Sequence, residues 1–188
     1  MKKYILIAGV NGAGKSTLYQ SLQSLQGMSR VNTHEILRDF GDWRNMADVM
    51  TAGKIAVKKI ARYLDEGITF NQETTLCGKS IINNITKAKN RGFFIELHYI
   101  GVESADIAKE RVAGRMKQGG HGIAEQDIER RYIETFDNLK TVLPECDLAA
   151  FYDNTIEFRR FAIYKSGSPV RISHHIPDWY ERFVADMT

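Results

Sequence analysis

The stretch Gly9-Val10-Asn11-Gly12-Ala13-Gly14-Lys15-Ser16 decides the fold that we expect for this chain. It fits the pattern G-x-x-x-x-G-K-[ST] of a phosphate-binding loop at every required position. The apolar run that precedes it, residues 4–8, is typical of a strand buried on both faces of a parallel sheet. Leucines at helical spacing follow over residues 15–25. This context predicts a P-loop nucleotide-binding protein, the alternative being a tight strand-to-helix turn.

The residues of this loop predict how the phosphates of ATP or GTP would be held. Glycines let backbone N–H groups approach a phosphate, and the helix N-terminus adds partial positive charge. We expect Lys15 to bridge the β- and γ-phosphates, the Ser16 hydroxyl to bind Mg²⁺, and Thr17 to lie near the α-phosphate. The nucleotide-binding residues expected here are Asn11, Gly12, Ala13, Gly14, Lys15, Ser16 and Thr17.

Length and composition predict one soluble globular domain over residues 1–188. The chain is 43% hydrophobic and 26% charged, close to the averages for such proteins. Its apolar runs are too short to span a bilayer, so we expect no membrane contact. The 26 basic and 23 acidic residues give a net charge of +3, which argues against a nucleic-acid partner. Two cysteines at no zinc-binding spacing favour a reducing, cytoplasmic location.

Strand and helix patterns alternate along the chain. The expected elements are strands near residues 30–32, 68–71, 92–100 and 148–152 and helices near residues 48–66, 80–91, 105–117 and 124–143. Residues 161–164 and 170–173 read as a hairpin, and a short helix follows Pro177. The sequence therefore predicts an α/β protein with the three-layer P-loop NTPase or kinase fold and a mostly parallel central sheet.

Five further segments, together with the loop and in this order, resemble the zeta-toxin-like kinases. They are residues 31–36 (VNTHEI), 71–78 (NQETTLCG), 119–123 (GGHGI), 127–132 (DIERRY) and 152–154 (YDN). The resemblance covers about residues 3–154. It implies a small-molecule kinase that transfers the γ-phosphate of ATP, rather than GTP, to a hydroxyl acceptor with Mg²⁺ present. The acceptor implied first is a nucleotide sugar such as UDP-N-acetylglucosamine, and an antitoxin protein is an implied partner.

One position departs from the family pattern. The family has an asparagine, a small residue and a proton-accepting aspartate after its second strand, whereas this chain has Asn32, Thr33 and His34. Three interpretations stay open: His34 is a working base, the chain is a weak or inactive member, or the substitution inactivates a toxic protein. Loss of a base that contributes about 10² to 10⁴ in rate slows transfer without abolishing it. If the alignment is displaced by one residue, Glu35 becomes the candidate base.

The resemblance implies two further substrate contacts. Glu73 resembles the acceptor-binding acid of the family, at the edge of the sheet where doubly wound folds place their ligands. Asn154 lies where the family has its adenine-side loop, so it is expected to bind the nucleotide base. The alternatives are a helix-capping turn with an exposed carboxylate for Glu73 and a simple turn for Asn154.

A helical lid is expected at about residues 111–131. Arginines over a transferring phosphoryl group neutralise its developing charge in a geometry that lysine does not reproduce. We favour Arg115 and Arg130, with Arg131 the close competitor because neighbouring residues point apart on a helix. The alternative is a solvated basic face. His121, in the glycine-rich break of the lid, either reaches phosphate or belongs to a turn.

Taken together, the sequence predicts an ATP-dependent phosphotransferase. Its expected catalytic residues are Lys15, His34, Glu73, Arg115 and Arg130. A catalytically weak nucleotide-binding regulator or protein-partner module is the alternative, and the histidine at position 34 favours it. A kinase acting on RNA or DNA ends is a second rival, against which the near-balanced charge argues.

Overall fold

A computed structural model describes residues 1–120 and 122–185 of the chain, so His121 lies outside the described residues. The strands are β1 (Lys3–Ala8), β2 (Ser29–Val31), β3 (Phe70–Thr74), β4 (Phe94–Gly101), β5 (Leu148–Asp153), β6 (Arg159–Lys165) and β7 (Ser168–Ile172). The helices are α1 (Lys15–Ser21), α2 (Thr33–Arg38), α3 (Met46–Glu66), α4 (Lys79–Asn90), α5 (Ala105–Lys117), α6 (Glu125–Val142) and α7 (Asp178–Phe183).

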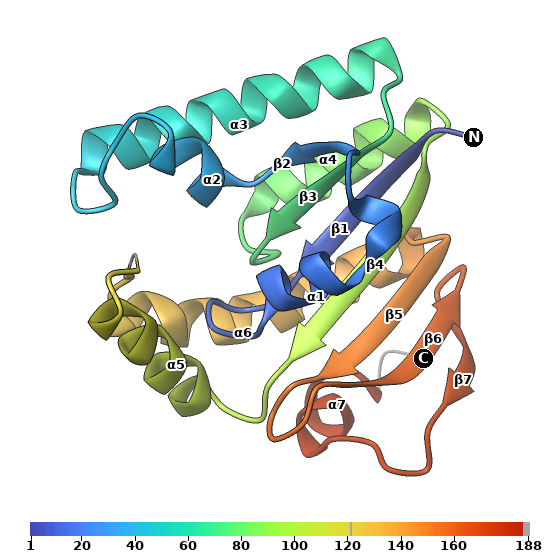
Figure 1. Cartoon of the computed structure of the whole chain (residues 1–188). Coiled ribbons are helices and arrows are strands. Elements are labelled where there is room, and N and C mark those ends of the chain that lie inside the picture. Colours follow the sequence, from blue (N-terminus) through green and yellow to red (C-terminus); the bar gives the residue numbers. More distant parts are fainter. Residues whose placement is uncertain (121, 186–188) are drawn as a thin grey trace.

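In the described part of the chain, seven strands form one sheet in the order β2-β3-β1-β4-β5-β6-β7 (Figure 1). The first five strands in this order are parallel, whereas β6 and β7 continue the sheet as antiparallel strands. Figure 1 shows α1 in front of the sheet and α4 and α6 behind it. The expected α/β fold with a mostly parallel central sheet is confirmed. No described helix has both the length and the apolar character needed to span a bilayer.

The register of the central strands brings several loops to one edge of the sheet. Ala8, the last residue of β1, pairs with Thr74 of β3 and Tyr99 of β4. Because these strands are parallel, the loop after β1 and the ends of β3 and β4 meet at the same edge. The alternation of side chains then puts Asn71 and Glu73 on one face of β3, at i and i+2.

Aromatic side chains fill much of the core between the sheet, α6 and α7. Tyr99 packs against Phe136 of α6 and Trp179 of α7, with ring centroids 5.9 and 6.0 Å away. Trp179 is fully buried, and its indole N–H donates to a carboxylate oxygen of Asp153 at 3.0 Å. The ring fills the space beside Gly101, where an added Cβ would lie 2.3 Å from it. The C-terminal helix therefore completes the core.

Most of the expected elements are confirmed, two have different bounds, and one helix was not expected. The helix expected over residues 15–25 ends at Ser21, where an extended backbone at the next residue leads into a separate 3₁₀ turn. The strand expected at residues 68–71 covers Phe70–Thr74 instead, so Glu73 lies within β3 and not beyond it. Helix α2 was not expected. It forms because the Asn32 side chain accepts hydrogen bonds from two backbone N–H groups of its first turn.

We expect Trp179→Ala to lower the free energy of unfolding by about 3–5 kcal/mol, because it leaves a large cavity and an unpaired acceptor in the core. Urea denaturation followed by circular dichroism measures the change. The matched control is Val170→Ala on exposed β7, which should stay within about 0.5 kcal/mol of the wild type. A loss below about 1 kcal/mol for Trp179→Ala would contradict the packing described for α7.

Candidate functional site

The P-loop follows β1 and depends on its glycines. Gly9, Gly12 and Gly14 have φ angles of 143°, 83° and 103°, which L side chains rarely adopt. An added Cβ at Gly9 would lie 2.3 Å from the Ile100 carbonyl oxygen, and one at Gly12 would lie 2.7 Å from the Ala108 carbonyl oxygen. The loop is therefore packed against the backbone of its neighbours, and only glycine fits at these positions.

Two asparagines hold the loop in place. Asn154 donates from Nδ2 to the Ala13 carbonyl oxygen at 2.9 Å, and an added Cβ at Gly14 would lie 2.5 Å from that nitrogen. Asn11 is buried, and its Oδ1 accepts a hydrogen bond from Arg131 at 3.1 Å. The structure thus places Asn154 against the loop backbone itself, beside the expected nucleotide site.

Lys15 begins α1 and is buried in the loop. Its Nζ donates to the carbonyl oxygens of Gly9 and Val10 at 2.9 and 3.0 Å. Burial lowers the pKa of Lys15 to about 8, Glu73 opposes this shift, and Arg115 adds to it. Burial therefore destabilises the ammonium form of Lys15, and an anion bound beside it would offset that destabilisation.

Glu73 lies on the face of β3 that points toward α1. Its Oε2 accepts from Arg30 at 2.9 Å and from Asn32 at 3.0 Å, and Ser16 Oγ lies 3.4 Å from Oε2 and 3.5 Å from Oε1. Only 7% of the Glu73 side chain is exposed. The alternative of an exposed carboxylate in a capping turn is therefore wrong.

Sequence reasoning missed Arg30, which joins three parts of the site. Its guanidinium pairs with Glu35 at 3.0 Å and with Glu73, and it donates to Asn71 at 2.8 Å. It also stacks on Tyr19 of α1, 3.5 Å from the ring centroid. The signal was polar residues at i and i+2, Arg30 within β2 with Asn32 just after it, and Asn71 with Glu73 within β3. It could be read only once β2 was known to pair with β3.

The two candidate bases lie next to each other on α2 and have different surroundings. His34 is exposed, and its backbone N–H donates to Asn32 Oδ1 at 2.9 Å. The Glu35 carboxylate accepts from Arg30 Nε at 3.0 Å and from Asn32 Nδ2 at 3.3 Å. Glu35 is therefore engaged in an ion pair with Arg30.

A cavity of about 600 Å³ opens beside the P-loop. On one side the loop and α1 line it, and on the other side α2 and the following turn line it, including Trp43 and Arg44. The predicted residues that line it together are Asn11, Gly12, Lys15, Ser16, His34, Glu73 and Arg115. Of the other predicted residues, Ala13 is buried in the loop and Thr17 is exposed on α1. The cavity thus joins a phosphate loop to a carboxylate and a histidine.

The arginines of the expected lid fall into different environments. Arg115 and the neighbouring Gly120 line the cavity. Arg130 is 58% exposed and pairs with Asp127 at 3.0 Å and Glu134 at 2.7 Å, as a solvated helix face would. Arg131 instead reaches Asn11 in the P-loop. The preference for Arg130 over Arg131 does not match this geometry, because the orientation of α6 directs Arg131 toward the loop.

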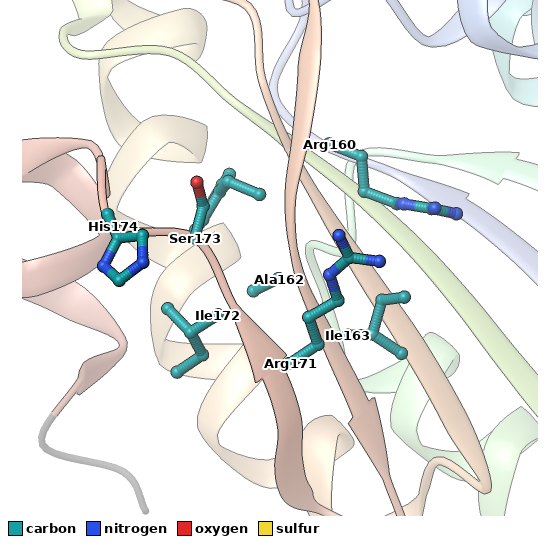
Figure 2. A pocket seen from close by; sticks show the side chains of 8 residues that line it. Arg160, Ala162, Ile163, Arg171, Ile172, Ser173 and His174 are labelled. Atoms are coloured by element: carbon teal, nitrogen blue, oxygen red, sulfur yellow. The ribbon is translucent and has the colours of Figure 1, made fainter.

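A second hollow, of about 340 Å³, is lined by residues of β6, of β7 and of the segment that follows β7 (Figure 2). Its lining includes Arg160, Arg171 and His174. None of the residues expected to act in catalysis or nucleotide binding is among those that line it. The candidate site is therefore the cavity beside the P-loop.

Comparison with known proteins gives one relative and several similar structures. No family model matches the chain. An uncharacterized protein of Haemophilus influenzae is 35% identical over 130 residues, which are 69% of this chain and 92% of that protein. A chain of the AvrRxo1-ORF1:-ORF2 complex with ATP superposes with a TM-score of 0.70 at 13% identity. The match covers 97% of this chain and 63% of that chain, so this protein spans less than two thirds of its length.

Two further solved structures share the fold. A chain of the PezAT chromosomal toxin–antitoxin system of Streptococcus pneumoniae has a TM-score of 0.65 and 15% identity, with 100% of this chain and 84% of that chain covered. A chain of the Pnkp1/Rnl/Hen1 RNA repair complex has a TM-score of 0.58 and 18% identity, with 73% of this chain and 45% of that chain covered. At these identities the likeness concerns the fold.

We expect Arg131→Ala to weaken the binding of ATP about tenfold or more, because it removes a cation that reaches the loop. The control is Arg130→Ala, which removes a neighbouring surface arginine and should change the affinity by less than about twofold. Isothermal titration calorimetry measures both. A larger loss in Arg130→Ala than in Arg131→Ala would reverse the assignment.

Proposed function

The chain belongs to one family with the Haemophilus influenzae protein and has the fold of the zeta-toxin-like P-loop kinases, and from this premise we propose that it is an ATP-dependent phosphotransferase. One observation carries the proposal: a single cavity joins Lys15 and Ser16 of the P-loop to Glu73 and His34. A loop that only held nucleotide and Mg²⁺ would not need a proton acceptor such as His34 facing it across such a space.

The P-loop side of the cavity fits ATP with Mg²⁺. The Ser16 hydroxyl and the Glu73 carboxylate lie 3.4–3.5 Å apart and supply oxygen donors, which Mg²⁺ prefers. Among the described residues no group of three or more His, Cys, Asp or Glu side chains could hold a metal ion. Bound Mg²⁺ would supply charge neutralisation on the phosphate oxygens.

The proposed reaction moves the γ-phosphoryl group to a hydroxyl. The bond between the γ-phosphorus and the β,γ-bridging oxygen breaks, a bond from the acceptor oxygen to that phosphorus forms, and ADP leaves. The hydroxyl proton goes to the imidazole of His34 or, where His34 does not accept it, to water. Lys15, Arg115 and Arg131 neutralise charge on the phosphates. Residues at about 111–131 act as the lid of a single domain spanning residues 1–188.

The acceptor in this proposal is a small molecule with hydroxyl groups. Glu73 would accept a hydrogen bond from one of them, and Trp43 and Arg44 offer an aromatic face and a cation at the far wall. A nucleotide sugar such as UDP-N-acetylglucosamine suits these groups. The neighbouring PezAT and AvrRxo1 structures belong to a toxin–antitoxin system and a two-protein complex, so a protein partner such as an antitoxin is part of the proposal.

A second candidate function is a nucleotide-binding module without useful turnover. His34, at the position where the family has its aspartate, favours this candidate because an imidazole lacks the negative charge of a carboxylate. The P-loop and its contacts would then serve nucleotide binding and a protein partner.

We expect His34→Asp to raise the rate of phosphoryl transfer at least about 10²-fold, because a carboxylate replaces a poorer base. The assay follows labelled γ-phosphate from ATP to a panel of nucleotide sugars with Mg²⁺. His174→Asp is the matched control at an exposed histidine in the second hollow, and it should not change the rate. A lower rate in His34→Asp would identify His34 as a working base. No transfer by either protein, despite bound ATP, would favour the module without turnover.

We also expect ATP binding at pH 8.5 to take up a fraction of a proton. Burial lowers the pKa of Lys15 to about 8, so part of the Lys15 population carries a neutral amine at pH 8.5, and a bound polyphosphate favours the ammonium form. Calorimetric titrations in buffers of different ionisation enthalpy measure the uptake. Lys15→Arg is charged throughout and should show none. Equal uptake by both proteins would exclude Lys15 as the source.

A further inference from the structure

Arg30 lies on β2 beside the candidate site and donates hydrogen bonds in three directions. Its side chain is 10% exposed. The guanidinium donates from Nη2 to Glu73, from Nη1 to Asn71 and from Nε to Glu35, at 2.9, 2.8 and 3.0 Å. These partners come from β3 and α2, while Arg30 itself belongs to β2. The side chain therefore links β2 to β3 and α2, and the last two contribute residues to the lining of the cavity.

The two carboxylate oxygens of Glu73 have different hydrogen-bond partners. Oε2 accepts from Arg30 at 2.9 Å and from Asn32 at 3.0 Å. Ser16 Oγ lies 3.4 Å from Oε2 and 3.5 Å from Oε1, and among the described residues it is the one hydrogen-bond contact of Oε1. A carboxylate oxygen has two lone pairs, so Oε2 is satisfied by its two N–H donors while Oε1 retains accepting capacity.

We propose that Arg30 is a positioning residue that holds Glu73 through Oε2 and thereby directs Oε1 to the cation bound at Ser16. This inference rests on the proposed function, in which Ser16 binds Mg²⁺. Oε1 would then be available to accept a hydrogen bond from a water of the bound ion, since Mg²⁺ usually keeps several waters. Glu73 would serve the metal in addition to the acceptor, and Arg30 would act through it.

The shape of arginine is what this role requires. A planar guanidinium has donors in fixed directions, so it can hold Glu73, Asn71 and Glu35 at once. Tyr19 stacks on its face at 3.5 Å from the ring centroid and fixes the plane. Lysine at the same position would keep the positive charge but could not make all three contacts. The charge alone therefore does not secure the orientation of Glu73, and Arg30→Lys separates charge from geometry.

The test measures how much Mg²⁺ tightens the binding of a fluorescent ADP analogue, N-methylanthraniloyl-ADP, compared with binding in EDTA. The proteins are wild type, Arg30→Lys, Glu73→Gln and the double variant. We expect each single variant to reduce the Mg²⁺ effect about tenfold while affinity in EDTA stays within about twofold. We expect the double variant to lose no more than one single variant does, because Arg30 acts through Glu73.

Two further proteins make the outcome specific. Arg62→Lys changes an exposed arginine on α3 and should keep the full Mg²⁺ effect. Tyr19→Leu removes the stacking ring without touching the ion pairs and should reduce the effect about threefold, which keeps the inference testable if Arg30→Lys does not fold.

Three results would count against the inference. A full Mg²⁺ effect in folded Arg30→Lys, or in Tyr19→Leu if Arg30→Lys does not fold, overturns it. Losses that add up in the double variant also overturn it, because Arg30 would then act independently of Glu73. In both cases nucleotide binding by the wild type leaves the proposed function standing. No binding of the ADP analogue by the wild type overturns the proposed function and this inference together.

Discussion

The left-handed backbone at Gly14 is the constraint on which the site depends. With φ at 103°, Gly14 caps α1 and makes Lys15 the first residue of the helix. The Asn154 side chain occupies the space that a Cβ at position 14 would need, so a larger residue at this position would displace Asn154. Lys15 is thereby buried with a pKa of about 8, bonded to loop carbonyls. Burial thus destabilises the charged form of Lys15. A bound polyphosphate would offset this destabilisation by placing negative charge beside the ammonium group.

The second half of the site follows from strand order. Because β3 lies between β2 and β1, side chains of β2 and β3 that point toward α1 share one face beneath the P-loop helix. Arg30 and Asn71 are paired in that register, and Glu73 follows two residues later, close to Ser16. Pairing of the strands therefore brings Arg30, Asn71 and Glu73 together without a long loop. These residues lie on strands, which hold side chains more rigidly than loops do, and this suits a site in which position decides the rate.

The sequence predicted the P-loop and the α/β alternation well, because a fixed spacing between a buried strand and a helix has few other structural meanings. It could not locate Arg30 or choose Arg131, since these depend on which strands pair and on how α6 is rotated about its axis. Helix α2 was missed because its cap, Asn32, lies in a polar segment without helical periodicity. The end of β3 was misplaced because its last residues are polar, yet they are the ones that reach the site.

Calorimetric titration of ATP with Mg²⁺ into the wild type and Lys15→Ala tests the central claim most directly, that residues 9–16 hold a polyphosphate. We expect saturable binding by the wild type and a loss of at least about 10²-fold in Lys15→Ala, because a desolvated charge-assisted contact is removed. Circular dichroism should show that both proteins are folded. Binding that is absent in the wild type, or equally tight in folded Lys15→Ala, would contradict a phosphate-holding role for this loop.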